Sequence, residues 1–352
     1  MFSRIKKIQN MLENGTAALI MSPANRFYLT GFRSSAGYVV ITPEKAVFLT
    51  DFRYFEKAKS VVKACETVML TSLSNQVKPM LGRTEKLYIE TDFVSVSQFS
   101  ELGNTLGVKI SDDKKLSQLL GGMRSVKTID EIDSIKAAQK ITDDAFKYIL
   151  PRITVGRTER EIMLDMEFFM RKNGSEGVAF DTITVSGKNS SLPHGVPTDK
   201  KIEKGDFITL DYGAVVNGYR SDMTRTVAVG NVSEEQRKVY NTVLKAQTAA
   251  IKVAHAGAVC KEVDKVARDI IAAVGFEGCF GHGLGHSVGL DIHENPCFNT
   301  RDETTLEKGM VITVEPGIYL ENKFGVRIED MIIITENGNE DITQSPKELI
   351  VL

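Results

Sequence analysis

Several features that mark whole classes of protein are missing from this chain of 352 residues. Its longest apolar runs are short segments such as 17–21, far below the roughly 20 residues that a membrane-spanning helix needs. Its formal net charge is −2 and it has no lysine- or arginine-rich tract, which excludes a strong bulk attraction to nucleic acid. Residues 1–15 predict a charged amphipathic helix without the apolar core of a signal peptide. We therefore expect neither a membrane nor a nucleic acid as a partner.

Cysteine and histidine are scarce, and their spacing limits what they can do. Four dispersed cysteines lack the C-x-x-C spacing of zinc sites and redox motifs: Cys65, Cys260, Cys279 and Cys297. Without a disulfide framework, the sequence predicts a protein of the reduced cytoplasm. Four of the five histidines, in contrast, fall within a hundred residues of one another: His194, His282, His286 and His293. This clustering makes them candidates for one shared site.

Length and composition predict two globular domains. Apolar residues make up 42% and charged residues 26%, which is ordinary, and 352 residues exceed what a single core usually serves. Residues 1–122 alternate apolar strands with helical stretches and contain no histidine, which predicts an α/β domain. Gly121–Arg124 is the expected boundary, so residues 123–352 form the second domain. In the first domain we expect strands over 17–21, 38–42, 46–50, 67–70 and 87–90, and helices over 52–62, 94–102 and 114–120.

The second domain repeats one order of elements. Three predicted helices open with a capping box, in which Ser or Thr is followed three residues later by Glu or Gln. These boxes are Thr128/Glu131, Thr158/Glu161 and Ser233/Gln236, and a fourth helix is predicted over 261–273. Strand-like sequence follows the second helix over 178–229 and continues after the fourth helix to residue 334. Helix–helix–strands therefore occurs twice, which predicts an α+β domain whose two halves share a cleft.

Acidic residues lie in or beside the strand-like apolar runs of this domain: Asp211, Asp222, Glu315 and Glu329. Carboxylates buried in such strands are costly unless they are paired or bind a metal. The Asn217-Gly218 pair between two strand patterns predicts a two-residue hairpin turn. Asp222 then lies opposite Gly213, and Asp211 becomes its diagonal neighbour on the same face, about 7–8 Å away at Cα. The alternative is that both aspartates face solvent on a half-exposed hairpin.

Arg327 and three of the histidines lie near these acids in the sequence. In a strand over 325–333, Arg327 and Glu329 share one face, so the guanidinium can orient a metal-binding carboxylate. The alternative for Arg327 is a plain surface ion pair. The glycine-rich segment 281–293, which carries three histidines, argues against a helix and lacks the glutamate of the H-E-x-x-H zinc motif. A single histidine there would more often be structural, but three beside paired acids indicate function.

Four carboxylates with a histidine cluster describe a site for two divalent metal ions. An oxygen-rich ligand set without thiolates suits Mn²⁺ first, with Co²⁺, Zn²⁺ or Fe²⁺ as alternatives. Two such ions about 3.5–4 Å apart activate a shared water and clamp a tetrahedral intermediate. A carboxylate can take the water's proton, and neutral histidines can donate to the developing oxyanion. These residues predict a metal-dependent hydrolase, with acyl and phosphoryl substrates both still open.

In sequence order, these motifs resemble the pita-bread metallopeptidases of family M24, and within them the aminopeptidase P/prolidase branch. The resemblance covers nearly the whole chain. Residues 25–32 and 49–54 are similar to an α/β creatinase/prolidase-type N-terminal domain. The segments that resemble the α+β pita-bread catalytic domain are residues 192–195, 210–213, 221–226, 281–296, 314–319 and 326–330.

The resemblance implies a role for each site residue. Asp211 would bind one metal, Asp222 and Glu329 would bridge both, and His286 and Glu315 would complete the other. Glu315 would also act as the proton acceptor. The residues expected to contact substrate and intermediate, or to support those that do, are His194, His282, His293, Arg327 and Tyr319.

The resemblance also implies hydrolysis of the peptide bond that precedes proline. We expect first an Xaa-Pro aminopeptidase acting on short peptides with proline in the second position. The alternative is an Xaa-Pro dipeptidase (prolidase) that accepts dipeptides only. A non-enzymatic, peptidase-like binding protein is a distant third possibility, because it would have lost the metal ligands that this chain keeps. Members of this branch are commonly homodimers in which the N-terminal domain helps to limit substrate length.

Overall fold

The computed structural model describes residues 1–352 and separates them into two compact units, residues 1–124 and 125–352. The strands of the first unit are β1 (Thr16–Ile20), β2 (Tyr38–Ile41), β3 (Ala46–Thr50), β4 (Glu66–Met69), β5 (Lys86–Ile89) and β6 (Lys109–Ile110). They form one six-stranded sheet in the order β4-β3-β2-β1-β5-β6. Because β1 pairs antiparallel with β2 and parallel with β5, the sheet is mixed.

The helices of the first unit confirm its α/β class. They are α1 (Phe2–Met11), α2 (Pro23–Thr30), α3 (Phe52–Val61), α4 (Leu73–Leu81), α5 (Val96–Leu106) and α6 (Lys115–Ser125). All the predicted strands and helices of this unit are present, the strand over 46–50 with the predicted bounds and the others with shifted ends, but α2, α4 and β6 were not predicted. Helix α6 runs through Gly121–Arg124, so the segment expected as the boundary is helical.

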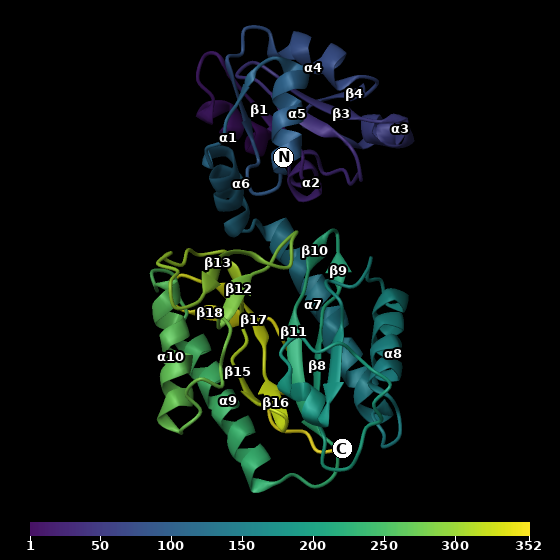
Figure 1. The fold of residues 1–352 in the computed structure, drawn as a ribbon, viewed down its shortest axis with the longest axis vertical. Helices are drawn as coiled ribbons and strands as arrows, with labels where there is room; N and C mark the ends of the chain where they lie inside the picture. The colour runs from purple at the N-terminus through teal and green to yellow at the C-terminus, as the bar shows by residue number, and fades with distance from the viewer. The chain divides into compact units, whose positions relative to one another are not determined.

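The second unit repeats helix, helix and strands, as the sequence predicts. Its first half contains α7 (Ile129–Ile149), α8 (Glu159–Lys172), β7 (Ile183–Ser186), β8 (Phe207–Tyr212), β9 (Val215–Val216), β10 (Tyr219–Arg220) and β11 (Met223–Ala228). Its second half contains α9 (Glu234–Val253), α10 (Cys260–Ala273), β12 (Gly285–Ser287), β13 (Glu294–Phe298), β14 (Val311–Val314), β15 (Gly317–Leu320), β16 (Phe324–Arg327), β17 (Asp330–Ile334) and β18 (Asn339–Asp341). Figure 1 shows α8 and α10 on opposite sides of these strands.

Each half of the second unit has its own sheet and apolar core. The larger sheets have the orders β11-β8-β7 and β13-β12-β14-β17-β18, and β9/β10 and β15/β16 form two-stranded ribbons. One core, which includes Phe146, Met166 and Leu210, lies between α7, α8 and the first sheet. The other, which includes Tyr240 and Ile332, lies between α9, α10 and the second sheet. No helix of the protein is both long enough and apolar enough to span a membrane.

The sequence over 325–333 was expected to form one strand, and this expectation was wrong. Strand β16 ends at Arg327 and pairs with β15, whereas β17 begins at Asp330 and pairs with β14. Ile328 and Glu329 join the two strands and are buried. The chain changes its strand partner at this point, and a run that is buried throughout gives no periodicity from which to locate the change.

Candidate metal centre

The hairpin that carries the two aspartates folds in the predicted register. Asn217 and Gly218 have φ angles of 50° and 85°, both in the left-handed region that a type I′ turn requires. Strands β8 and β11 then pair so that Asp211 lies opposite Thr224. Because Asp211 and Asp222 are 8% and 4% exposed, the alternative of two solvent-facing aspartates is wrong.

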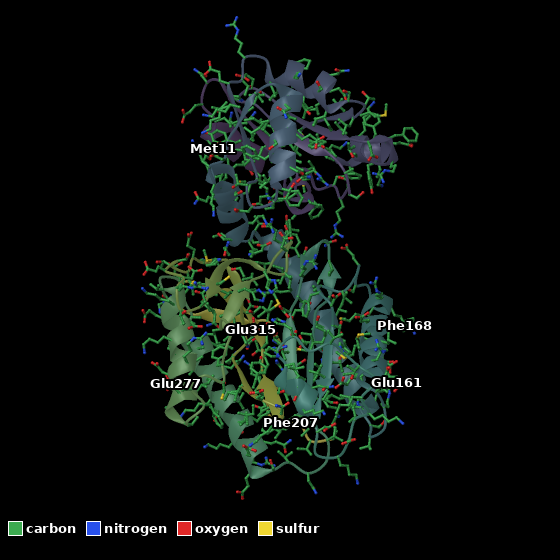
Figure 2. All side chains as sticks on the ribbon, viewed as in Figure 1. Met11, Glu161, Phe168, Phe207, Glu277 and Glu315 are labelled. Atoms are coloured by element: carbon green, nitrogen blue, oxygen red, sulfur yellow. The ribbon has the colours of Figure 1, made fainter.

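Three other segments bring an imidazole and two carboxylates to the same place. His286 lies in β12, Glu315 directly follows β14, and Glu329 lies between β16 and β17. Ligand atoms of Asp222, His286 and Glu329 all lie within 4.8 Å of one another. His286 Nε2 is 3.6 Å from Asp222 Oδ2 and 3.5 Å from Glu315 Oε1. Figure 2 labels Glu315 in the interior of the second unit, among the strands.

Burial and mutual repulsion disfavour the charged forms of these groups. Burial, together with the charges of Asp211 and Glu315, raises the pKa of Asp222 well above its ordinary value. Burial and the Asp222 charge do the same to the pKa of Glu329. Burial also raises the pKa of Glu315 to about 8 and lowers the pKa of His286 to about 4. A group of carboxylates held so close together favours a cation between them.

Unpartnered oxygen atoms support the same conclusion. Oδ1 of Asp211 and Oδ1 of Asp222 are buried and accept no hydrogen bond from the protein. A buried carboxylate oxygen without a partner is costly, and a coordinated cation removes that cost. Carboxylate oxygens with one imidazole nitrogen are donors that divalent metal ions such as Mn²⁺ accept. These residues therefore fit the divalent metal centre that the sequence predicts.

Arg327 connects one of these carboxylates to the predicted substrate-contacting residues. Its side chain is only 4% exposed, so the alternative of a surface ion pair is wrong. Nη2 donates to Asp211 Oδ2 at 2.6 Å, and Nη1 donates to Tyr319 Oη at 2.8 Å. Tyr319 Oη lies 2.9 Å from His282 Nε2, and His282 Nδ1 lies 2.8 Å from the Gly283 carbonyl oxygen. Since that carbonyl only accepts, we assign the proton to Nδ1, so that Nε2 accepts from Tyr319.

Neutral imidazoles are consistent with this hydrogen-bond chain. Burial, with the nearby Arg327 charge, lowers the pKa of His282 to about 4. Burial, with His194, lowers the pKa of His293 in the same direction. The His293 ring meets the His286 ring edge to face, with centroids 4.4 Å apart. At neutral pH the imidazoles of His282, His286 and His293 are therefore neutral, and each has one nitrogen that donates and one that accepts.

Thr224 belongs to the centre and was missed in the sequence analysis. Its hydroxyl donates to Glu329 Oε2 at 2.7 Å and accepts from Arg327 Nε at 3.0 Å. It thereby orients a carboxylate and the guanidinium at once. The signal for it was available, since Thr224 stands opposite Asp211 in the predicted hairpin register.

The centre opens into a cavity of about 920 Å³. Every predicted site residue lines this cavity except Tyr319. Tyr319 forms hydrogen bonds with two residues that do line it, His282 and Arg327. The cavity also exposes Arg301 and Cys297, for which the sequence offered no motif that would mark them. The structure thus brings together all the residues to which the sequence analysis gave a site role.

The two units match two known families. Residues 4–126 match the Creatinase/Prolidase N-terminal domain, and residues 133–336 match Metallopeptidase family M24. The Xaa-Pro dipeptidase of Pyrococcus furiosus is 39% identical over 355 residues, which cover 99% of this chain and 100% of that protein.

Solved structures give the same result for the fold. An Xaa-Pro dipeptidase from Bacillus anthracis has a TM-score of 0.94 and 40% identity, covering 100% of this chain and 99% of that one. An X-Pro aminopeptidase from Thermotoga maritima has a TM-score of 0.90 and 37% identity, covering 98% of this chain and 100% of that one. With its buried carboxylates, clustered histidines and full-length matches, this chain belongs to metallopeptidase family M24, with a creatinase/prolidase-type N-terminal domain.

Proposed function

We propose that this metallopeptidase is an Xaa-Pro dipeptidase, which cleaves the bond before proline in dipeptides. The observation that carries the proposal is the full-length likeness to proteins named Xaa-Pro dipeptidase or prolidase, at 38% to 40% identity. The likeness to an X-Pro aminopeptidase is also full-length, at 37% identity. The expected aminopeptidase is therefore the second candidate, and the prolidase alternative has the better support.

We assign the metal-binding role to Asp211, Asp222, His286, Glu315 and Glu329. Two divalent cations bound there would lower the pKa of a shared water and stabilise the oxyanion of the intermediate. Glu315 takes the proton of the attacking water on its carboxylate. The imidazoles of His194, His282 and His293 contact the peptide and its tetrahedral intermediate, while Tyr319 and Arg327 orient His282 and Asp211.

Arg301 supports the choice of a dipeptide. Its exposed side chain lines the cavity, and its guanidinium makes no hydrogen bond or ion pair with the protein. Arg327, the other arginine of the cavity, is already bound to Asp211 and Tyr319. A dipeptide presents its terminal carboxylate directly after the proline, where a longer peptide has a neutral amide. Arginine binds carboxylates through two charge-assisted hydrogen bonds, so Arg301 favours the dipeptide.

A substrate panel in Mn²⁺ tests this proposal. We expect Xaa-Pro dipeptides to be cleaved with a higher kcat/KM than Xaa-Pro-Yaa-Zaa peptides. Arg301→Ala should lower kcat/KM for the dipeptide by about 10- to 100-fold, the worth of a hydrogen bond to a charged group, and should affect the tetrapeptide less. Lys308→Ala, which removes an exposed cation outside the cavity, serves as the control. Faster cleavage of the tetrapeptides by the wild type would favour the aminopeptidase instead.

The proposal also covers metal, assembly and location. We propose two metal ions, Mn²⁺ first because the donors are mainly carboxylates, with Co²⁺, Zn²⁺ or Fe²⁺ as alternatives. We further propose that the protein is a cytoplasmic homodimer. We also propose that its two functional domains divide between residues 122 and 123. Metal analysis of the purified protein, its mass in solution and cell fractionation test the first three points, and limited proteolysis tests the division.

A further inference from the structure

Residues 280–284 form a short loop that carries His282 into the cavity. Glycines on both sides of this histidine, Gly281 and Gly283, give the backbone more freedom than other residues would. Gly283 is also needed for close packing, because a Cβ there would lie 2.9 Å from the Phe298 carbonyl oxygen. Neither glycine has a side chain that could hold the loop in place. The position of the loop therefore depends on contacts that other residues make with its backbone.

An ion pair on helix α10, formed by a partly exposed arginine and a buried aspartate, binds this loop. Arg268 Nε donates to Asp264 Oδ2 at 2.6 Å and Nη2 donates to Oδ1 at 3.0 Å, and Asp264 is completely buried. The same guanidinium donates to the carbonyl oxygens of Phe280, at 3.0 Å, and of His282. Asp264 Oδ1 accepts from the Leu284 amide at 3.1 Å. The pair thus binds the loop backbone before, at and after the histidine.

The ring of Phe280 adds a second connection between the pair and the imidazole. The Arg268 guanidinium lies 4.4 Å from the centroid of the Phe280 ring. That ring meets the His282 ring at 90°, with centroids 5.0 Å apart. A shift of Arg268 would therefore move both the backbone and one packing face of His282.

We infer that the Asp264–Arg268 pair is a positioning device for His282, holding its Nε2 toward Tyr319 and the cavity. This inference rests on the role that the proposed function gives to His282. Neither Asp264 nor Arg268 lines the cavity, so both act through the loop and not on the substrate. A misplacement of a catalytic group by about 1 Å can cost about 10²-fold in rate. Loss of the Asp264–Arg268 pair therefore lowers kcat with little effect on KM.

Two variants of Arg268 test the inference on the full-length, Mn²⁺-loaded enzyme with an Xaa-Pro dipeptide. Arg268→Ala removes the guanidinium, but it leaves Asp264 buried without its partner and can unfold the protein. Arg268→Lys keeps the positive charge but lacks the planar fork that serves one carboxylate and two carbonyls together. We expect either folded variant to lose about 10- to 100-fold in kcat at unchanged metal content. Lys265→Ala, from an exposed ion pair with Asp269 on the same helix, should keep wild-type kcat.

A double-mutant cycle with His282→Ala separates positioning from general damage. If Arg268 acts through His282, Arg268→Lys should lower kcat by no more than about 2-fold in the His282→Ala background. Equal losses from Arg268→Lys in both backgrounds, or wild-type kcat for Arg268→Lys, would overturn the inference. Wild-type kcat for His282→Ala alone would instead refute the role of His282 in the proposed function. Because Arg268→Lys retains the charge next to Asp264, the cycle does not depend on whether Arg268→Ala folds.

Discussion

At the scale of single residues, Asp222 and Glu329 are the carboxylates whose charge most needs a bound metal ion. Both are almost fully buried, and neither pairs with an arginine or lysine. Asp222→Asn and Glu329→Gln keep the shape of each side chain and remove its charge. We expect each variant to bind metal at least about 100-fold more weakly and to lose activity accordingly, since even groups outside the ligand set change metal affinity by about 10- to 100-fold.

Metal analysis and metal titration of the two variants check this expectation. Glu277→Gln changes an exposed glutamate of the same unit in the same chemical way and should bind metal like the wild type. Full metal content and wild-type affinity in both Asp222→Asn and Glu329→Gln would show that these carboxylates are not shared metal ligands.

Which site residues the sequence can reveal depends on how local their signal is. Acids set in apolar strands and histidines set among glycines are unusual in their own sequence context, so the sequence analysis singled them out. Arg268 has no such mark, because an i,i+4 pair such as that with Asp264 is common on helices, and the carbonyls that it binds belong to a loop 12 and 14 residues further along the chain. The role proposed for Arg301 depends on the cavity that its side chain lines, and a cavity has no signature in a linear sequence.

At the scale of elements, the β-turn at Asn217-Gly218 sets which residues of β8 and β11 lie opposite each other. Gly218→Ala places a side chain on a residue with φ of 85°, which L residues rarely adopt. We expect a loss of about 1 kcal/mol in the free energy of unfolding, typical of a non-glycine residue held in that region. Weaker metal binding should accompany the loss, because a shift in register would separate Asp211 from Asp222.

Denaturant unfolding and metal titration check the effect of the turn. Gly177→Ala is the matched control, because Gly177 belongs to the same unit, has no positive φ and leaves open space for a Cβ. If Gly218→Ala and Gly177→Ala were equally stable and bound metal equally well, the turn would not be what fixes the register.

The elements that were predicted differ from the missed ones in their local signals. Helices α7, α8 and α9 open with the three predicted capping boxes, and all three boxes form. Helices α2 and α4 were missed, and both contain proline, at the first position of α2 and within α4. Proline is tolerated at the start of a helix but usually ends one, so it hides a helix that tertiary packing stabilises. The division of 325–333 into two strands likewise depends on distant pairing partners.

At the scale of the whole molecule, the two units have separate apolar cores, one of which includes Leu19, Leu49 and Ile89 of the first unit. All candidate metal ligands belong to the second unit. Bound metal stabilises only the folded state that holds it. We therefore expect two transitions on heating, of which only the transition of the second unit moves to lower temperature when a chelator removes the metal.

Scanning calorimetry with and without chelator measures both transitions. In an Asp222→Asn variant, the transition of the second unit should occur at the lower temperature both with and without chelator. This result separates loss of metal from any other effect of the chelator. A single transition that shifts as a whole would contradict independent unfolding of the two units.

The spacing of the candidate ligands along the chain has a consequence for synthesis. The first, Asp211 in β8, and the last, Glu329 between β16 and β17, lie far apart along the sequence of one unit, and no shorter stretch contains the whole proposed set. A nascent chain on the ribosome therefore has no complete centre until residue 329 has emerged, long after the N-terminal unit has been made. With the proposed ligand set, we expect translation products that stop before that residue not to cleave peptides, so that hydrolytic capacity arises in a single late step.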